Sequence, residues 1–385
     1  MFFPGARWGD REGATVLFNL LLVLSSVATT VGAIEVYLRL TGYSPMKELL
    51  DGRELIVRAS SNPLRRYEGT PHASGVAWRA LVKLNSQGFR DDEYPMAKDE
   101  GVYRIVTLGD SIAFGNLLSV EETFSNRLER LFQSANDRVE VINMAMGGYD
   151  TLQEVATLET VGTRFGPDLV LVTFCFNDIG TDSVNLDYIE KVATYRSSPV
   201  YRLRVAQFLR ARLDRVSARY ASREPMGDEE FLASNEGHVV DVGNDELLRS
   251  RIEDLERALA RGRDYHGFAP LYASQARIGK LRHALDRLRE LSQANGFMVL
   301  GAIVPVLDGT PENADLYRVI DEIVADEFER QGFDVVSMSS EFSAEGLDGL
   351  RRWDDDRLHP NARGHRLIAE ILFREVRRLR RESRR

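Results

Sequence analysis

The residues best suited to chemistry are a serine and a histidine that lie far apart in the chain. Ser111 follows Gly109 and Asp110 directly after an apolar run, and Asp356 precedes His359 by three positions near the other end. A serine hydroxyl needs a base to accept its proton, and a neutral imidazole does this near pH 7. An acid partner fixes the imidazole tautomer and stabilises its charged form. Ser111, His359 and Asp356 are therefore candidates for nucleophile, base and orienting acid.

Two further segments offer hydrogen-bond donors. Negative charge develops on the carbonyl oxygen during acyl transfer and needs such donors. The segment Asn143–Tyr149 contains two glycines, which let a backbone N–H approach a substrate closely. Asn177 has a side-chain amide that can donate. Each short segment also has a plain structural interpretation, because Gly-Asp-Ser is a common turn and N-cap sequence, and an acidic turn before Pro360 fits a helix start.

Short β-rich runs alternate with amphipathic helical patterns after residue 100, which indicates a βαβ architecture and a parallel sheet. Five strands are expected: Arg104–Leu108, Val139–Asn143, Leu169–Phe176, Phe297–Val304 and Asp334–Met338. Helical spacing of apolar residues predicts helices after Glu122, over Leu152–Phe165, and around 278–291, 316–328 and 367–376. The candidate serine, glycines, asparagine and histidine thus follow different strands. In a doubly wound sheet, ligands bind at the carboxyl ends of the strands.

A long gap separates the third and fourth strands. It holds an insertion near Thr181–Leu271 that is rich in arginine and helical in pattern, for example over Val200–Arg215 and Asp245–Arg261. The insertion is interpreted either as a cap over the active site or as a solvated decoration without a catalytic part.

The N-terminal part contains one long apolar run. From Gly13 to Ile34, 22 residues include no Asp, Glu, Lys, Arg or His. A helix of this length is ~33 Å long, enough to cross a ~30 Å hydrocarbon layer. We expect one uncleaved membrane helix over 13–36, with the short head 1–12 retained inside and the rest outside. A cleaved signal peptide ending at Val31-Gly32-Ala33 and a buried core helix are the alternatives.

Composition sets further limits. The 385 residues are 43% apolar and 28% charged, the usual balance for a globular chain. Cys175 is the only cysteine, which excludes an intramolecular disulfide and a four-cysteine metal site. A net charge of −9 argues against general nucleic-acid binding. The remaining histidines lack metal-ligand spacing, so no metal or cofactor is expected.

Together these motifs resemble the SGNH hydrolases, also called the GDSL esterase/lipase family, over roughly residues 101–378 outside the insertion. The resemblance makes Ser111 the implied nucleophile and completes a triad with Asp356 and His359. It implies an oxyanion hole formed by the N–H of Ser111, the N–H of Gly148 and the amide of Asn177. Ile112, Ala145 and Cys175 depart from frequent family residues, Leu, Gly and Gly respectively.

The resemblance implies a three-layer α/β/α fold with a five-stranded parallel, flavodoxin-like sheet. The segment Asn85–Asp91 also looks like the lead-in of membrane-anchored bacterial members, and packing against the sheet edge is the default expectation for it. The expected organisation is a cytoplasmic head (1–12), a transmembrane helix (13–36), a juxtamembrane stalk and lead-in (37–100), a hydrolase domain (101–378) with the insertion at about 181–271, and a basic tail (379–385).

The expected function is a serine esterase that hydrolyses O-acyl groups of cell-envelope carbohydrate or lipid, at a bacterial inner membrane and facing outward. One alternative is an O-acetyltransferase acting on an exopolysaccharide. Alginate-type acetyltransferases that resemble this fold usually have Asp-x-His, so the Asp356-x-x-His359 spacing favours hydrolysis. The other alternative is a non-catalytic protein of envelope assembly, against which the complete triad argues. Protein partners are not indicated.

Overall fold

The computed structural model describes residues 9–42, 56–77, 80–180, 198–220, 227–264 and 267–383. The chain divides into two compact units, one made of Met1–Asp51 with Glu190–Arg223 and the other of Gly52–Ile189 with Glu224–Arg385. Residues 1–8 of the expected head and 181–197 of the expected insertion lie outside the described part. The domain boundaries drawn from the sequence stay predictions.

The second unit is built on a parallel five-stranded sheet with the order β6-β5-β7-β8-β9. Its strands are β5 (Tyr103–Gly109), β6 (Val139–Asn143), β7 (Leu169–Phe174), β8 (Met298–Ile303) and β9 (Asp334–Ser337). In chain order this is 2-1-3-4-5, the flavodoxin-like arrangement. The expected fold class is confirmed, and the strand order reverses beside β5, which is where a ligand crevice forms in such sheets.

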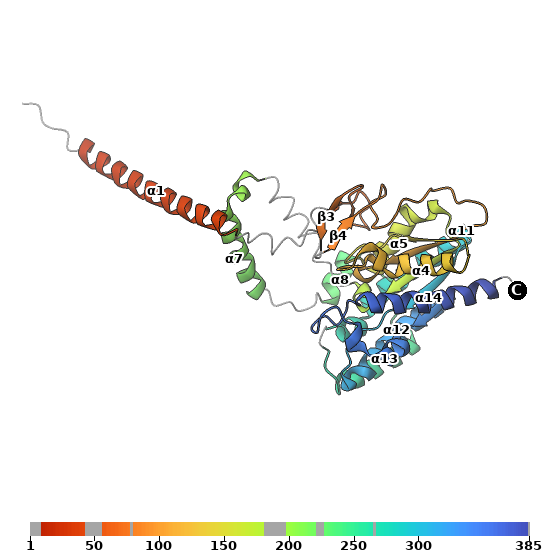
Figure 1. The fold of residues 1–385 in the computed structure, drawn as a ribbon. Helices are drawn as coiled ribbons and strands as arrows, with labels where there is room; N and C mark the ends of the chain where they lie inside the picture. Colours follow the sequence, from red (N-terminus) through yellow and green to blue (C-terminus); the bar gives the residue numbers. More distant parts are fainter. Residues whose placement is uncertain are drawn as a thin grey trace, which may run out of the picture. The chain divides into compact units, whose positions relative to one another are not determined.

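Helices cover both faces of the sheet, because the central strands are apolar on both sides; β7 is buried at every position. One layer consists of α4 (Phe124–Ser134) and α14 (Ala362–Glu382), whose apolar residues share one core cluster and which lie side by side in Figure 1. The other layer consists of α5 (Thr151–Thr160), α11 (Gln275–Asn295) and α12 (Ala314–Arg330). All five expected helices are therefore present.

Shorter elements connect this framework. They are α3 (Ser111–Phe114), η2 (Val120–Glu122), η3 (Gly162–Phe165), η4 (Phe176–Ile179), η6 (Pro311–Asn313), α13 (Ser339–Glu345) and η7 (Leu347–Leu350). Two of them, α13 and η7, separate β9 from the segment that contains Asp356 and His359. Sequence periodicity misses these elements because each is two turns or shorter.

The insertion is shared between the two units. Its first described part, η5 (Pro199–Arg202) and α7 (Arg204–Tyr220), groups with the N-terminal helix. Its second part, α8 (Asp228–Ser234), α9 (Glu246–Leu259) and α10 (Ala269–Ala273), packs on α11 and α12 of the sheet-containing unit. The two interpretations of the insertion, a cap over the active site and a solvated decoration without a catalytic part, both stay predictions.

The lead-in segment contains two antiparallel hairpins that the sequence did not indicate. They are β1 (Val57–Ala59) with β2 (Tyr67–Gly69), and β3 (Ser74–Ala77) with β4 (Ala80–Lys83). Strands of three or four residues are too short for a period-two pattern to stand out from the surrounding glycines and charges.

The N-terminal helix α1 spans Gly9–Leu40. Its stretch Thr15–Leu40 contains an 18-residue window with a mean hydropathy of 2.0, and none of that window is buried inside the protein. The helix is long and apolar enough to serve as a membrane span or as a signal sequence.

Candidate active site

Ser111 begins the short helix that follows the central strand. β5 ends at Gly109, and Asp110 caps the helix, since its Oδ1 accepts a hydrogen bond from the Ile112 N–H at 2.8 Å. Gly109 has a φ of +156°, and a Cβ at this position would lie only 2.6 Å from the Cβ of Ala113. Only glycine fits such a turn without displacing a neighbour. The strand-to-helix turn therefore sets the serine at the carboxyl edge of the sheet.

His359 lies within hydrogen-bond distance of Ser111, although 248 positions separate them. The Ser111 Oγ is 3.0 Å from His359 Nε2. The second ring nitrogen, Nδ1, is 3.0 and 3.1 Å from the two carboxylate oxygens of Asp356. A hydroxyl, an imidazole and a carboxylate in this order can move a proton from the serine to the histidine while the carboxylate holds the tautomer.

The loop that carries His359 is tied to the loop after β8. The Leu307 N–H donates to the Arg357 carbonyl at 2.7 Å, and the Arg351 Nε donates to the Leu307 carbonyl at 2.6 Å. Asn361 then caps α14, because its side-chain oxygen accepts from two N–H groups of the first turn. These contacts hold the loop at both ends, and thus fix where the imidazole meets the serine.

The charges around the imidazole favour its protonated form. Burial lowers the pKa of His359, but the hydrogen bond and negative charge of Asp356, with a further contribution from Asp110, raise that pKa above its ordinary value. Burial conversely raises the pKa of Asp356, and its hydrogen bonds with the His359 ring and with backbone N–H groups bring that pKa below its ordinary value. The imidazole is therefore a stronger base than a free histidine, with an ionised carboxylate beside it.

Gly148 lies on the loop that follows β6. Its φ of +84° belongs to the left-handed region that favours glycine. A tyrosine pair from the lead-in and from this loop supports it: the Tyr67 hydroxyl donates to the Gly147 carbonyl at 2.9 Å, and the Tyr149 hydroxyl donates to the Tyr67 carbonyl. The orientation of the peptide next to Gly148 is thus held from the hairpin β1–β2.

Asn177 lies in η4, directly after β7, and its amide reaches the same carboxylate as the serine. The Asn177 Nδ2 donates to Asp110 Oδ2 at 2.9 Å, and the Ser111 Oγ lies 3.0 Å from that oxygen. The Tyr272 hydroxyl donates to the carbonyl of Phe176 at 3.0 Å and fixes the neighbouring peptide. The structure therefore brings the serine, the histidine, the aspartate and the asparagine into one hydrogen-bonded group.

Asp110 is the contact that sequence reasoning missed. Its side chain is buried, and it joins Ser111 to Asn177 through one oxygen while capping α3 with the other. The signal was present, because Asp110 lies in the Gly-Asp-Ser segment, but a cap was the only role that the sequence suggested for it. Its contact with Asn177 requires β5 and β7 to be neighbours in the sheet, and this pairing is part of the tertiary structure.

The lead-in segment Asn85–Asp91 contacts the carboxyl end of α3, the short helix that Ser111 begins. The Arg90 guanidinium donates to the carbonyls of Phe114, Gly115 and Leu118 at 3.1, 2.6 and 2.6 Å. These bonds satisfy backbone groups at and beyond the carboxyl end of α3. The neighbouring Asp91 Oδ2 accepts from the Asn143 N–H at 2.7 Å, at the end of the edge strand β6. The default expectation of packing at the sheet edge thus describes Asp91, whereas Arg90 contacts the carboxyl end of the helix that Ser111 begins.

Buried acids lie beneath the site. Burial, together with the negative charge of Asp110, raises the pKa of both Glu154 and Asp178 well above the ordinary range. Burial also raises the pKa of the Cys175 thiol, again with Asp110 contributing. The surroundings therefore disfavour the charged forms of these three groups, and the Cys175 thiol donates a hydrogen bond to Asn177 Oδ1 at 2.7 Å.

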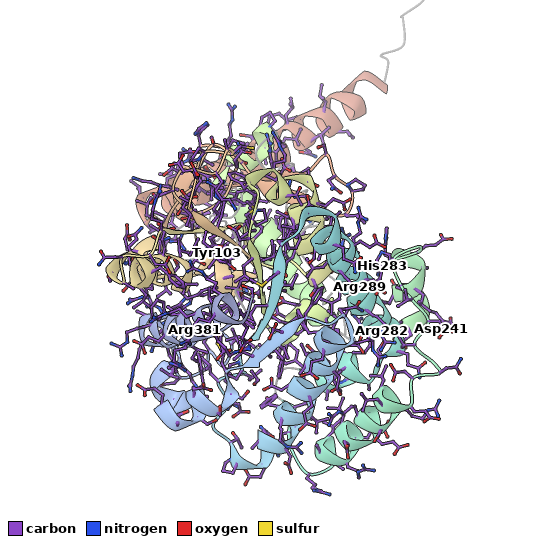
Figure 2. All side chains as sticks on the ribbon, turned by 90° about the vertical axis from the view of Figure 1, so that its right-hand side faces the viewer. Tyr103, Asp241, Arg282, His283, Arg289 and Arg381 are labelled. Atoms are coloured by element: carbon purple, nitrogen blue, oxygen red, sulfur yellow. The ribbon has the colours of Figure 1, made fainter. Side chains whose placement is uncertain are left out.

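Two other histidines, His238 and His283, lie against each other. His283 and Arg282 lie on α11 near the segment that carries Asp241 (Figure 2), and the centre of the His283 ring is 5.4 Å from that of His238. Burial, followed by the neighbouring His238, lowers the pKa of His283. Among the residues that the structure describes, no cluster of three or more His, Cys, Asp or Glu side chains is arranged to hold a metal ion.

Comparison with known proteins places the chain in a family. A model of the GDSL-like lipase/acylhydrolase family matches residues 107–367. Among curated proteins no sequence matches the chain. The solved structures that match include the acetyl xylan esterase AlAXEase, which is 13% identical, with 71% of this chain and 99% of that chain covered at a TM-score of 0.39.

Two further matches are similar in extent. The acetylxylan esterase Axe2 from Geobacillus stearothermophilus is 15% identical, with 71% of this chain and 94% of that chain covered at a TM-score of 0.37. The psychrotrophic esterase EstA from Pseudoalteromonas sp. is 13% identical, with 72% and 97% covered at a TM-score of 0.37.

The family match spans all four segments that were singled out from the sequence, from Gly109 to His359, and more than half of the chain. The chain belongs to the GDSL-like lipase/acylhydrolase family and is an ester-hydrolysing enzyme.

Proposed function

We propose that the protein is a serine esterase in which Ser111 is the nucleophile, His359 the general base and Asp356 the residue that orients the imidazole. The observation that carries the proposal is the unbroken line of contacts from Ser111 Oγ to His359 Nε2 at 3.0 Å and from His359 Nδ1 to Asp356 at 3.0 and 3.1 Å. Nucleophile and base within 2.6–3.2 Å, with the base oriented by a third group, is the arrangement that activates a serine.

The reaction proceeds in two acyl transfers. Ser111 Oγ attacks the ester carbonyl carbon while His359 Nε2 takes its proton, and the tetrahedral intermediate collapses as the imidazolium returns that proton to the leaving alcohol. Water then attacks the acyl-serine with the same base, and the acid and free Ser111 are released. Asp356 stays ionised and stabilises the imidazolium in both halves, in keeping with its lowered pKa.

Three donors would hold the oxyanion: the N–H of Ser111, the N–H of Gly148 and the Asn177 amide. Support comes from the position of all three in the segments that follow the carboxyl ends of β5, β6 and β7. The Asn177 Nδ2 donates to Asp110 Oδ2 at 2.9 Å, and this bond holds the amide at the carboxyl end of β7, beside Ser111.

The test is chemical labelling combined with turnover. A fluorophosphonate probe should label Ser111 in the folded wild type, and Ser111→Ala should abolish both labelling and hydrolysis of p-nitrophenyl acetate. Ser125→Ala, at a buried serine of α4, is the matched control and should keep the label. An Ser111→Ala protein that hydrolyses the ester at the wild-type rate would refute the proposed mechanism.

The proposed location is a bacterial inner membrane, with α1 as a single span and the catalytic unit outside. The run Gly13–Ile34 without charge and the exposed apolar surface of α1 support a span. A catalytic unit tethered there would meet O-acylated carbohydrate or lipid of the envelope, which is the proposed substrate class. Protease added to spheroplasts should degrade the catalytic unit; protection of that unit until the membrane is broken would place it inside.

Hydrolysis is distinguished from acetyl transfer by the fate of the acyl group. With an acetylated oligosaccharide and an excess of unmodified oligosaccharide acceptor, an esterase releases free acetate in step with deacetylation. Transfer of acetyl groups to the acceptor in excess over acetate would instead identify the protein as an acetyltransferase.

A further inference from the structure

The helix α7 lies against the end of the membrane helix, within the first compact unit. The Val205 N–H donates to the Glu35 carboxylate at 2.9 Å, and the Arg39 guanidinium donates to the Arg202 carbonyl at 3.2 Å. Glu35 and Arg39 also form an ion pair at 2.7 Å. Figure 1 shows α7 beginning beside the last turns of α1 and then diverging from it. The start of α7 is therefore attached to one turn of α1.

That turn of α1 corresponds to the edge of the bilayer. Glu35 is the first charged residue after the uncharged run Gly13–Ile34. This run alone accounts for ~33 Å of helix, close to the ~30 Å of the hydrocarbon layer, so Glu35 and Arg39 fall at the level of the lipid headgroups. Because the first turn of α7 is hydrogen-bonded to Glu35, α7 begins at that level too.

The composition of 198–220 suits this level. The segment contains six arginines and one acidic residue, Asp214. Val205, Leu209 and Leu213 follow each other at intervals of four, which puts them on one face of the helix, and Val216 and Tyr220 continue the repeat in the sequence. A basic helix with one apolar stripe is the pattern of a helix that lies in a membrane interface.

The apolar face of α7 is left uncovered by its own unit. Leu209 and Leu213 are 56% and 64% exposed, and Val200 and Leu203 in the preceding turn are 58% and 44% exposed. In the matching α9 of the other unit, by contrast, Leu248 and Leu255 are buried against neighbouring helices. An apolar stripe beside a membrane span, flanked by arginines, points to lipid as the missing neighbour.

We propose that α7, with η5, is an interfacial helix that lies on the outer surface of the membrane and binds anionic phospholipid. Its apolar side chains enter the boundary between headgroups and acyl chains, and its arginines contact lipid phosphates. The proposal rests on the proposed membrane span of α1. It gives the first part of the insertion a role in holding the enzyme at the membrane surface.

Depth measurements on the full-length protein in nanodiscs test the proposal. A nitroxide label is placed on Leu213→Cys, on Val23→Cys within α1, or on Leu247→Cys, a 49% exposed leucine of α9. Cys175 is buried with a raised thiol pKa and remains unlabelled. The label at position 213 should be more accessible to oxygen than to a water-soluble nickel complex, whereas the label at position 247 should show the reverse.

The three labels separate the possible failures. If position 23 is in lipid but position 213 is exposed to water, the span is right and the interfacial helix is wrong. If position 213 is shielded from both oxygen and nickel, a protein surface covers it, which also overturns the proposal. If position 23 itself is exposed to water, the membrane span fails, and the proposal fails with it, while esterase activity is unaffected.

A second arm tests the lipid charge. Nanodiscs of phosphatidylcholine alone are compared with nanodiscs that also contain phosphatidylglycerol. The label at position 213 should lie deeper with the anionic lipid, and Arg210→Gln/Arg212→Gln should remove that difference. The matched double variant Arg249→Gln/Arg257→Gln on α9 should show the same difference in label depth between the two lipids as the unmodified protein. Equal depth in both lipids for the unmodified helix would show that anionic lipid is not the ligand.

Discussion

The side-chain amide of Asn177 donates a hydrogen bond to the carboxylate of Asp110 at 2.9 Å, and the same carboxylate oxygen lies 3.0 Å from the Ser111 hydroxyl. A buried aspartate that precedes the proposed nucleophile therefore sets the position of a proposed oxyanion donor that follows the neighbouring strand β7. Because one amide proton is held by Asp110, the amide plane is fixed before substrate arrives. Preorganisation of this kind lowers the cost of stabilising the transition state.

The first prediction concerns Asp110→Asn. The variant keeps the shape of the side chain but replaces a charged acceptor of the Asn177 amide with a neutral group. We expect kcat to fall by roughly 10²-fold, the loss that follows removal of one oxyanion donor, with little change in KM. Steady-state kinetics on p-nitrophenyl acetate measure both constants. Asp99→Asn, at an exposed side chain, is the control, and an unchanged kcat in Asp110→Asn would contradict the role assigned to the carboxylate.

The second prediction concerns the pH profile. The proposed base must be neutral to accept the serine proton, and the pKa of His359 is raised by Asp356 and Asp110 after burial has lowered it. kcat/KM should therefore rise with pH through a midpoint above ~6.5, the ordinary value for histidine. Asp356→Asn removes the hydrogen bond and the charge, so the midpoint of its residual activity should move to lower pH. A wild-type midpoint at or below the ordinary value would disagree with the geometry.

The third prediction concerns Arg90→Lys. Lysine keeps the positive charge but has no planar fork, so it cannot reach the carbonyls of Phe114, Gly115 and Leu118 together. Each buried carbonyl left without a donor costs about 1–3 kcal/mol, and the end of the nucleophile helix loosens. We expect a lower Tm and a lower rate of fluorophosphonate labelling at Ser111. Arg58→Lys, on an exposed side chain of β1, should change neither.

A purely structural role for Arg90 gives a different result. In that case the Tm of Arg90→Lys falls, but the labelling rate of the fraction that remains folded equals that of the wild type.

The fourth prediction concerns acid stability and His365. This histidine is buried, stacks on Phe124 and accepts a hydrogen bond from the Phe124 N–H, and burial lowers its pKa to about 3. In the unfolded chain His365 takes up a proton near pH ~6.5, whereas in the folded chain it stays neutral until about pH 3. Protonation therefore favours the unfolded chain, and the free energy of unfolding falls by up to ~1.4 kcal/mol per pH unit as the pH drops from ~6.5 towards 3.

His365→Gln tests this linkage by difference. The variant should be less stable than the wild type at pH 7 because the ring contact is lost. As the pH is lowered from 7, however, the Tm of the variant should fall less steeply than that of the wild type. Thermal unfolding in detergent measures both values. If the Tm of the two proteins falls equally with pH, the pKa of His365 does not differ between the folded and the unfolded chain, and the prediction is wrong.

The sequence by itself determined the parts that depend on local patterns. Continuous apolar runs predicted β7 and β8 because strands covered on both faces must be apolar throughout. Helical spacing predicted α4, α5, α11, α12 and α14, and the uncharged run predicted the apolar helix α1. The short motifs led to Ser111, Asn177, Asp356 and His359 because segments of matching chemistry followed different elements, and the family resemblance singled out Gly148.

The tertiary structure alone decided which groups touch. Sequence order says nothing of the strand order that sets β7 beside β5 and so brings Asn177 to Asp110. It also says nothing of Arg90 reaching the end of α3 from the lead-in, or of α7 joining α1 across more than 160 positions. Periodicity reports which face of an element is buried, whereas these contacts depend on loop paths and on single hydrogen bonds, which leave no repeating pattern in the chain.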